Sequence, residues 1–432
     1  MDIQEKIKDG FKRIIVITSL LATPIMSFAY DGKLQQLNDA ELSEVNGQAL
    51  LSLSYIDPKD SANTMKGQGV GFYKLGLEAE LELNANIKKL QLGCGGVNGA
   101  KGCDIDIDNL SLSGISDTRE GRVTSDAKLT NPFIEFAIKN PEKASTREVV
   151  GLRLSAEKVL GLLSAGTENT TTPNGINSLS GYLKINPTTG TGYTAARNMG
   201  YADTGQSING NIRTSFLLIP IVTGFQSNDY NLMLDSAKAD INLNGTTISG
   251  NRMSSVQLDG LAKINQLNFS GNLAASLNIT GGLLTLQKQV SGNITGLTAN
   301  ISVDENLGYI HKIPLNNPFS LSLQSQNVWW PGAAASAQKG WWLAVEDPVN
   351  IGDVSPAQKI VITNDVLKQV VGPISSYITN NPVQCSLLQC IGGALSVGNV
   401  NLPNTSVNFP LKDLQLSNQN FAPNCYGNLK FC

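Results

Sequence analysis

Few residues of this 432-residue chain have the spacing of catalytic groups. Ser155 and Lys158 have the Ser-x-x-Lys spacing of a serine nucleophile with a lysine base, and Ser336 and Lys339 repeat it. The companion Lys-Thr-Gly element is absent, as are Gly-x-Ser-x-Gly, the P-loop signature and His-Glu-x-x-His. His311 is the one histidine, and no acid or nucleophile pattern adjoins it. We therefore expect that the protein is not an enzyme and has no cofactor.

Three carboxylates alternate along a run that has the pattern of a strand. Asp104, Asp106 and Asp108 would share one strand face, about 7 Å apart. Such carboxylates repel one another, and calcium is the ion that they would bind. The EF-hand pattern fails, because Asn109 stands in place of the glycine and Ile115 in place of the bidentate acid. We therefore expect a solvated strand face and no metal site.

The six cysteines form three close pairs in the sequence. The pairs are Cys94 with Cys103, Cys385 with Cys390, and Cys425 with Cys432. Six cysteines allow 15 connectivities, of which local pairing is the simplest. A metal site is disfavoured because no Cys-x-x-Cys occurs and the chain has a single histidine. We predict disulfides, which persist in exported proteins.

All four tryptophans lie within residues 329–342, as two adjacent pairs. Neighbouring side chains on a strand point to opposite faces, so we expect one tryptophan of each pair to be buried and the other exposed. Exposed aromatic residues with a polar rim mark interfaces, whereas a fully covered cluster would be core. The candidate partner-contact residues are Trp329, Trp330, Trp341 and Trp342.

The N-terminal segment has the pattern of a secretory signal peptide. Four basic residues precede a mostly apolar run at 14–26, and Ser27 and Ala29 give a small-x-small ending. The run is too short for a membrane span of about 20 residues. We predict cleavage after residue 29 and export of the remainder. The net charge of −3 argues against nucleic acid as a partner, because phosphate binding needs a basic surface.

Strand patterns dominate the middle of the chain. Residues 74–92 alternate for most of their length: Leu75, Leu77, Ala79, Leu81 and Leu83 fall on one face, and Glu78, Glu80 and Glu82 on the other. Residues 104–108 repeat the alternation beyond the first cysteine loop, so the two runs predict a hairpin. Residues 164–212 are rich in Thr, Asn, Gly and Ser, and we expect loops and short edge strands there.

A Ser-Gly-Asn repeat begins at residues 249, 270 and 291, with a spacing of 21. Asp259-Gly260 and Gly281-Gly282 lie halfway between the copies and are hairpin-turn signals. Turns every ten or eleven residues predict an antiparallel meander. A β-solenoid with a 21-residue coil is the alternative.

The predicted fold is all-β: an antiparallel meander, extended sheet or sandwich, with a short N-terminal helix and a helical, disulfide-bonded C-terminal cap. Residues 365–378 predict a helix that is interrupted or kinked at Gly372-Pro373. The predicted parts are a signal peptide at 1–29, a short helical tag at 30–50, a first β region at 51–212, a second β region with the repeat at 213–352, and the helix and disulfide-rich cap at 353–432.

The segment Ala40-Glu41-Leu42-Ser43-Glu44-Val45-Asn46-Gly47-Gln48-Ala49 resembles a tag that follows the signal peptide in exported Gram-negative surface proteins. With the strand at 131–138, the run at 148–154 and the length, the chain resembles the FilA-type pilus-system proteins. The resemblance implies an exported, β-rich protein of the periplasm, outer membrane or cell surface, with other subunits of a surface or pilus assembly as partners. That family offers no catalytic residues to carry over.

We therefore expect an exported structural protein that acts by protein–protein contacts, through sheet-edge pairing or an apolar face with the tryptophans. Two alternatives stay open. Alternating strands of about ten residues would also suit an outer-membrane β-barrel. An apolar sheet face would also suit a periplasmic carrier of a lipid or other hydrophobic ligand. Aromatic bands would favour the barrel, and a continuous apolar groove would favour the carrier. An exposed sheet edge or patch would favour the structural component.

Overall fold

A computed structural model gives the fold and describes residues 51–116, 118–167, 174–216, 219–279, 282–316, 319–349, 352–412 and 414–417. Strands account for 61% of the residues and helices for 9%, which confirms the all-β prediction. The predicted signal peptide and the helical tag lie outside the described residues. So do Cys425 and Cys432, the third predicted disulfide pair.

The largest sheet has twelve strands, in the order β1-β2-β6-β7-β20-β21-β8-β5-β4, with β3 on β6, β14 on β8 and β19 on β7. Its strands are β1 (Leu51–Ile56), β2 (Val70–Leu77), β3 (Glu80–Leu83), β4 (Ala85–Leu92), β5 (Ile105–Ser113), β6 (Ala127–Lys139), β7 (Glu148–Ser164), β8 (Ile176–Ile185), β14 (Thr246–Met253), β19 (Lys312–Leu315), β20 (Phe319–Gln324) and β21 (Gly340–Val349).

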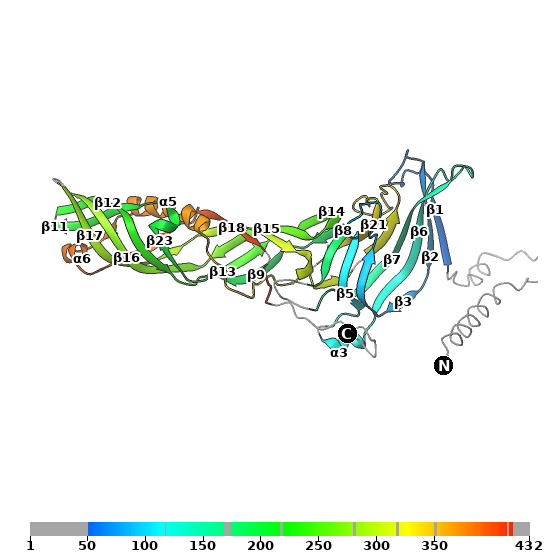
Figure 1. The fold of residues 1–432 in the computed structure, drawn as a ribbon, viewed down its shortest axis with the longest axis horizontal. Helices are drawn as coiled ribbons and strands as arrows, with labels where there is room; N and C mark the ends of the chain where they lie inside the picture. The colour runs from blue at the N-terminus through cyan, green and yellow to red at the C-terminus, as the bar shows by residue number, and fades with distance from the viewer. Residues whose placement is uncertain are drawn as a thin grey trace, which may run out of the picture. The chain divides into compact units, whose positions relative to one another are not determined.

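Part of this sheet closes on itself, and three consecutive strands extend outward from the closed part. The last residues of β5 pair with the end of β7, with Ser111 opposite Ser164. The strands β7, β20, β21, β8 and β5 therefore form a ring. β6, β2 and β1 continue outward from β7, and we call these three strands the wing (Figure 1). The short helix α3 (Arg119–Val123) connects β5 to β6.

Two smaller sheets complete the fold. The seven-stranded sheet contains β10 (Arg197–Gly200), β11 (Ile208–Phe216), β12 (Ile219–Leu234), β16 (Gln266–Ile279), β17 (Gly282–Thr295), β22 (Val383–Gln384) and β23 (Ala394–Asn401). The five-stranded sheet contains β9 (Thr188–Tyr193), β13 (Lys238–Leu243), β15 (Ser255–Ile264), β18 (Thr298–Asn306) and β24 (Ser406–Lys412), and it lies between the other two (Figure 1). The short helices are α4 (Tyr201–Thr204), η1 (Leu307–Tyr309) and α6 (Leu387–Ile391).

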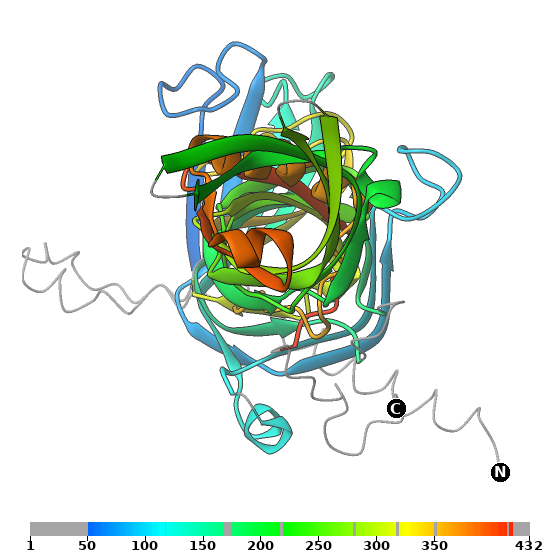
Figure 2. The ribbon, with the colours of Figure 1, turned by 90° about the vertical axis from the view of Figure 1, so that its left-hand side faces the viewer.

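One hydrophobic core runs through all three sheets, which curl around it (Figure 2). The long helix α5 (Asn364–Asn380) packs on β11 and closes this core. Thr363 caps its N-terminus by accepting a hydrogen bond from the Val366 amide. The helix continues through Pro373, so the predicted interruption is wrong. Its apolar face, which includes Leu367 and Val371, is buried, and this packing holds the turn that contains the proline.

The hairpin across the first cysteine loop is confirmed. β4 and β5 are antiparallel, with Leu92 opposite Ile105. The longer alternating run at 74–92 is divided into the end of β2, then β3 and β4. β2 and β3 both pair with β6, whereas β4 pairs with β5.

The repeat contributes to two different sheets. The copies that begin at Ser270 and Ser291 face each other in the β16–β17 hairpin, while the copy at Ser249 pairs with β8 in the largest sheet. The predicted turn at Asp259-Gly260 is wrong, because both residues lie inside β15. A Cβ on Gly260 would lie 2.2 Å from the Asn242 carbonyl oxygen, so this glycine permits close strand contact instead of a turn.

Long-range pairing also changes the expected organisation. The loops and edge strands expected at 164–212 include β8, which is an interior strand with β21, β5 and β14 as neighbours. β20 and β21 come from the predicted second β region but join strands of the first. From the predicted cap, β23 and β24 pair in parallel with β17 and β18. Parallel pairs need long crossover connections, and the local pattern of the sequence carries no sign of them.

Candidate functional site

The Ser-x-x-Lys residues on β7 do not form a catalytic pair. Ser155 and Lys158 are three residues apart on a strand, so their side chains point to opposite faces. The Ser155 hydroxyl donates a hydrogen bond to the Phe319 carbonyl at 2.9 Å. Ser336 and Lys339 lie between β20 and β21, outside any strand.

His311 is a core residue. Its Nδ1 donates a hydrogen bond to the Ala165 carbonyl at 3.2 Å, and its own carbonyl accepts from the Ala165 amide. Burial lowers the pKa of His311 to about 4, against the opposing effect of the bond to the carbonyl. The imidazole is therefore neutral at pH 7.

The three aspartates on β5 and before it are paired with cations of the chain itself. Asp104 is only 1% exposed, which corrects the expectation of a solvated face, and it accepts hydrogen bonds from Arg252 Nε and from the Trp341 amide, each at 3.0 Å. The Lys89 ammonium lies 2.6 Å from Asp106 and 2.9 Å from Asp108. Within the described residues, no three His, Cys, Asp or Glu side chains gather as metal ligands.

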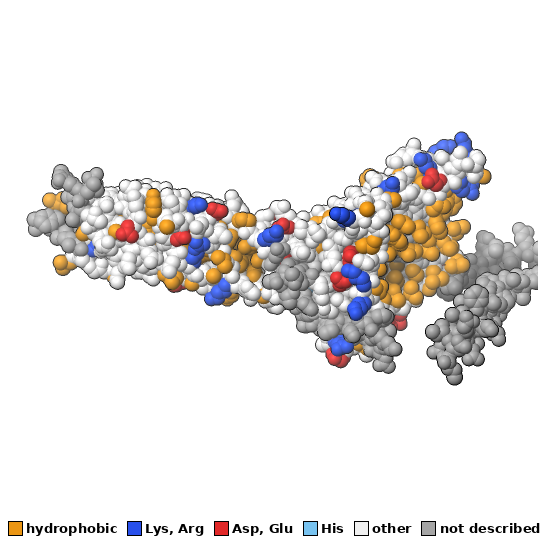
Figure 3. Space-filling model, viewed as in Figure 1, with side chains coloured by type: hydrophobic (Ala, Val, Ile, Leu, Met, Phe, Trp, Pro, Cys, Tyr) orange, Lys and Arg blue, Asp and Glu red, His pale blue; other side chains and the backbone are white. Residues whose placement is uncertain are grey.

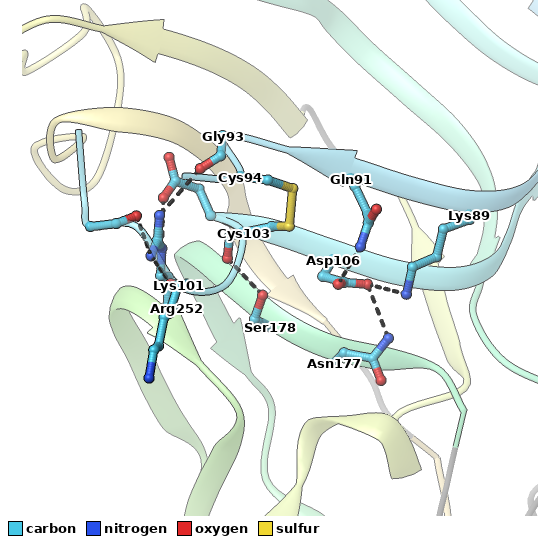
Figure 4. Close-up of a disulfide and its surroundings, with 12 residues drawn as sticks. Lys89, Gln91, Gly93, Cys94, Lys101, Cys103, Asp106, Asn177, Ser178 and Arg252 are labelled. Carbon is cyan, nitrogen blue, oxygen red and sulfur yellow. Dashed lines mark hydrogen bonds and ion pairs between the residues drawn. A yellow bond between two sulfur atoms is a disulfide. The ribbon is translucent and has the colours of Figure 1, made fainter. Parts of the chain in front are cut away.

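The electrostatics of this cluster keep Asp106 ionised. Burial by itself would raise the pKa of Asp106, but hydrogen bonds from Lys89, Gln91 and Asn177 outweigh it and hold the pKa below its usual value (Figure 4). Burial by itself would lower the pKa of Lys89, but its contacts with Asp106 and Asp108 outweigh this effect and raise it. The cluster therefore joins β4, β5 and β8 instead of offering a vacant cation site.

A disulfide and an arginine fix the loop between β4 and β5. Cys94 and Cys103 are bonded, and the Arg252 guanidinium donates to the carbonyls of Gly93 and Lys101 in the same loop (Figure 4). This disulfide follows the predicted local pairing.

A second disulfide joins Cys385 to Cys390 at α6, again as predicted. Cys425 and Cys432, the third predicted pair, lie outside the described residues, so a bond between them stays a prediction. The two disulfides that are present indicate a non-reducing, extracytoplasmic environment. None of the described helices combines the length and the apolarity needed to cross a membrane.

The tryptophans mostly form core. Trp330 and Trp342 are buried in a second cluster with Phe72 and Val150, while Trp329 is 45% exposed and Trp341 is half-buried. One member of each pair is therefore buried. Strand alternation applies only to Trp341 and Trp342 on β21, because Trp329 and Trp330 lie outside any strand. A partner-contact role for this group stays a prediction, and Trp329 offers most of the accessible surface.

The wing has one covered face. On it, Lys74, Glu135 and Arg153 occupy neighbouring register positions on β2, β6 and β7. Arg153 and Glu135 form a buried ion pair, and Arg153 also lies over the Trp330 ring, 5.3 Å from its centroid. Burial raises the pKa of Glu135 despite the adjacent guanidinium.

The other face of the wing is apolar and open, and this open face continues from the wing onto β7 and β20. Strand register aligns Leu53, Leu75, Ile134, Leu154 and Leu321 as one row across β1, β2, β6, β7 and β20. The first four of these side chains are 76%, 41%, 39% and 44% exposed. Figure 3 shows hydrophobic side chains gathered over this part of the largest sheet.

The open face is hollowed into a groove of about 520 Å³. None of the described residues that line it is charged. They are Leu51, Leu75, Gly76, Leu77, Leu129, Pro132, Phe133, Ile134, Leu154, Ser155, Ala156, Val159, Phe319 and Leu321. Four cavities inside the cores measure only about 20–70 Å³ each. Among these spaces, the groove is the one with the size of a binding site, for which roughly 300–1,000 Å³ is usual.

Sequence reasoning located this face only in part. The alternating leucines at 75 and 77 indicated a strand with an apolar face, and docking through such a face was expected. The contributions of Ile134 and Leu154 could not be predicted, because they depend on the order of the strands in the sheet. Comparison with known proteins adds no functional assignment: no family model matches the sequence, and neither a curated protein nor a solved structure matches it.

Proposed function

We propose that this protein is an extracytoplasmic structural component that assembles with other protein subunits through the open apolar face of the wing. The supporting observation is the row of aliphatic side chains that is aligned across five strands and exposed on four of them. Contiguous exposed apolar patches with polar rims are typical of protein interaction sites. Burial of such surface contributes about 25 cal/mol per Å² to association.

The cellular setting is part of the same proposal. Resemblance at residues 40–49 supports a surface or pilus-like assembly of a Gram-negative bacterium, in the periplasm, at the outer membrane or on the cell surface. The two disulfides support the extracytoplasmic part of this setting.

The open geometry favours a protein partner over a small hydrophobic ligand. Ligand pockets usually enclose about 70–90% of their occupant. This face instead continues outward to β1, where Leu53 is 76% exposed. The groove volume of about 520 Å³ nevertheless suits a hydrophobic ligand, so a carrier is the second candidate.

Cell fractionation tests the proposal. The tagged parent chain and the variants Leu154→Lys and Leu261→Lys are produced in the native organism, and surface material is sheared and sized. Leu261 is 54% exposed on β15, away from the wing, and serves as the matched control. We expect the parent and Leu261→Lys in high-mass material and Leu154→Lys in the low-mass fraction. A parent chain that is recovered only as a free periplasmic monomer would contradict the proposal and favour the carrier.

A further inference from the structure

Nearly every open sheet edge in the described chain carries a feature that discourages pairing with another strand. Charges, proline, irregular register and coverage by other segments are the usual protections of such edges. β3 has Glu80 and Glu82, and β4 has Lys88 and Lys89. β24 has Pro410 and Lys412, as β19 has Pro314 and Lys312.

The remaining edges, apart from β1, are protected in other ways. β14 and β23 have shifts in register, β22 has two residues, and β10 has four with Arg197 among them. β9 is covered by the segment after β21, where the Val354 amide donates to the Thr189 carbonyl.

Among the described residues, β1 has none of these protections. Its sequence, Leu-Ser-Leu-Ser-Tyr-Ile, contains no charge and no proline, and its register with β2 is regular over all six residues. Within the described residues it pairs with β2 alone. Leu51, Leu53 and Tyr55 are exposed and continue the open face to the last strand of the wing. Such an edge is a template for another strand.

The strand that best fits β1 must be uncharged, free of proline and alternating between large apolar and small polar residues. β1 is itself such a strand. In an antiparallel pair centred on Leu53, Leu51 of one copy faces Tyr55 of the other, Ser52 faces Ser54, and Leu53 faces Leu53. Leu51, Leu53 and Tyr55 then lie on one face, and the two serines lie with Ile56 on the other. Cross-strand pairs of these kinds are stabilising.

Other registers are less favourable. A shift of one position would place leucines opposite serines on the wrong face. Centring on Ser54 would place Leu51 opposite Asp57. With Leu53 at the centre, the two Asp57 residues stand eight residue positions apart, about 26 Å, so they do not repel.

We propose that β1 pairs antiparallel with β1 of a second copy of this chain, about a twofold axis at Leu53, and that this pairing joins two open apolar faces into one. The interface is isologous, because each copy contributes the same strand. The inference rests on the proposed function, since it names one partner of the same face.

Thiol cross-linking and mass measurement test the register. The two Cα atoms of position 53 would be about 4.5–5.5 Å apart across the pair, within the range that a disulfide spans. Single variants Leu53→Cys, Leu51→Cys and Ser54→Cys of the exported chain are oxidised and run on non-reducing gels, with the parent chain giving the background of the native cysteines. We expect a covalent dimer from Leu53→Cys at several times the yield of the other two variants.

Sedimentation of the parent chain should give twice the chain mass. Leu53→Lys places two positive charges opposite each other at the twofold axis and should raise the dissociation constant of the dimer by roughly tenfold or more. Leu261→Lys should leave the dissociation constant unchanged. A parent chain that is monomeric at about 100 µM, or equal cross-linking from all three positions, would overturn the self-pairing. Either result would leave the proposed function untouched. The proposed function is tested separately, by whether the parent chain and Leu154→Lys occur in the sheared high-mass surface material.

Discussion

The buried imidazole of His311 predicts a specific acid sensitivity. The pKa of this histidine is about 4 in the folded chain, against 6.5 when exposed, because burial disfavours the charged ring. The unfolded chain therefore binds a proton between pH 6.5 and 4 that the folded chain does not, so stability falls as the pH is lowered through this window. At 1.36 kcal/mol per pKa unit, the loss is about 3 kcal/mol and is complete near pH 4.

The variant His311→Asn isolates this contribution. Asparagine cannot take up the proton, and its side-chain amide can still donate to the Ala165 carbonyl that His311 contacts at 3.2 Å. The variant loses some packing at every pH, so the quantity to compare is the slope of stability with pH. Urea unfolding of both chains at several pH values from 7 to 4 gives the two slopes. Carboxylates titrate in both chains and cancel in the difference.

We expect the parent chain to lose about 3 kcal/mol more than His311→Asn between pH 6.5 and 4. Since His311 is the only histidine, its proton resonances give the pKa directly. Parallel slopes, or a histidine that titrates near 6.5 in the folded chain, would refute the assignment of a neutral core imidazole.

Three further substitutions test other parts of the structure by thermal and denaturant unfolding. Glu135→Gln leaves the buried guanidinium of Arg153 without its counter-ion and should cost roughly 3–5 kcal/mol. Replacement of Cys94 and Cys103 by serine opens a loop with a sequence separation of 9 and should cost about 2–3 kcal/mol. Gly260→Ala places a methyl group against the backbone of β13 and should cost roughly 1–3 kcal/mol.

Each of these substitutions has a control. Glu80→Gln removes the exposed ion pair with Lys128 and should cost less than about 1 kcal/mol. A reductant should destabilise the parent chain but have less effect on the variant without Cys94 and Cys103. Asp259→Ala lies beside Gly260 on the exposed face of β15 and should be nearly neutral. If Glu80→Gln cost as much stability as Glu135→Gln, the buried ion pair would not be the cause of the loss. If Asp259→Ala cost as much as Gly260→Ala, close contact between β15 and β13 would not be the cause.

Local patterns predicted the parts of the fold that depend on neighbouring residues. Alternation on both sides of Cys94 and Cys103 was enough to predict the β4–β5 hairpin, because both strands and their connection lie within one short segment. The same reasoning failed at Gly260, where a glycine that serves close contact between strands has the same sequence signal as a glycine in a turn.

The candidate site was harder to predict because it exists only through pairing at long range. Leu53, Ile134 and Leu154 come together only when β2 pairs with β6 and β6 with β7, and no single segment contains that information. The tryptophans attracted attention by their type, yet Trp330 and Trp342 are buried under the opposite, covered face of the wing. Residue type thus drew attention to the tryptophans, whereas the open face consists of aliphatic side chains.

Site-specific photo-cross-linking in intact cells shows whether another protein covers the open face. A photoreactive residue at position 154, on the open face, is compared with one at position 261, which is similarly exposed on β15. We expect protein adducts of high mass from position 154, which are lost when Leu53 is also changed to lysine, and few or none from position 261. Adducts of equal yield from both positions, or only lipid-sized adducts from position 154, would contradict an open face that acts by protein–protein contact.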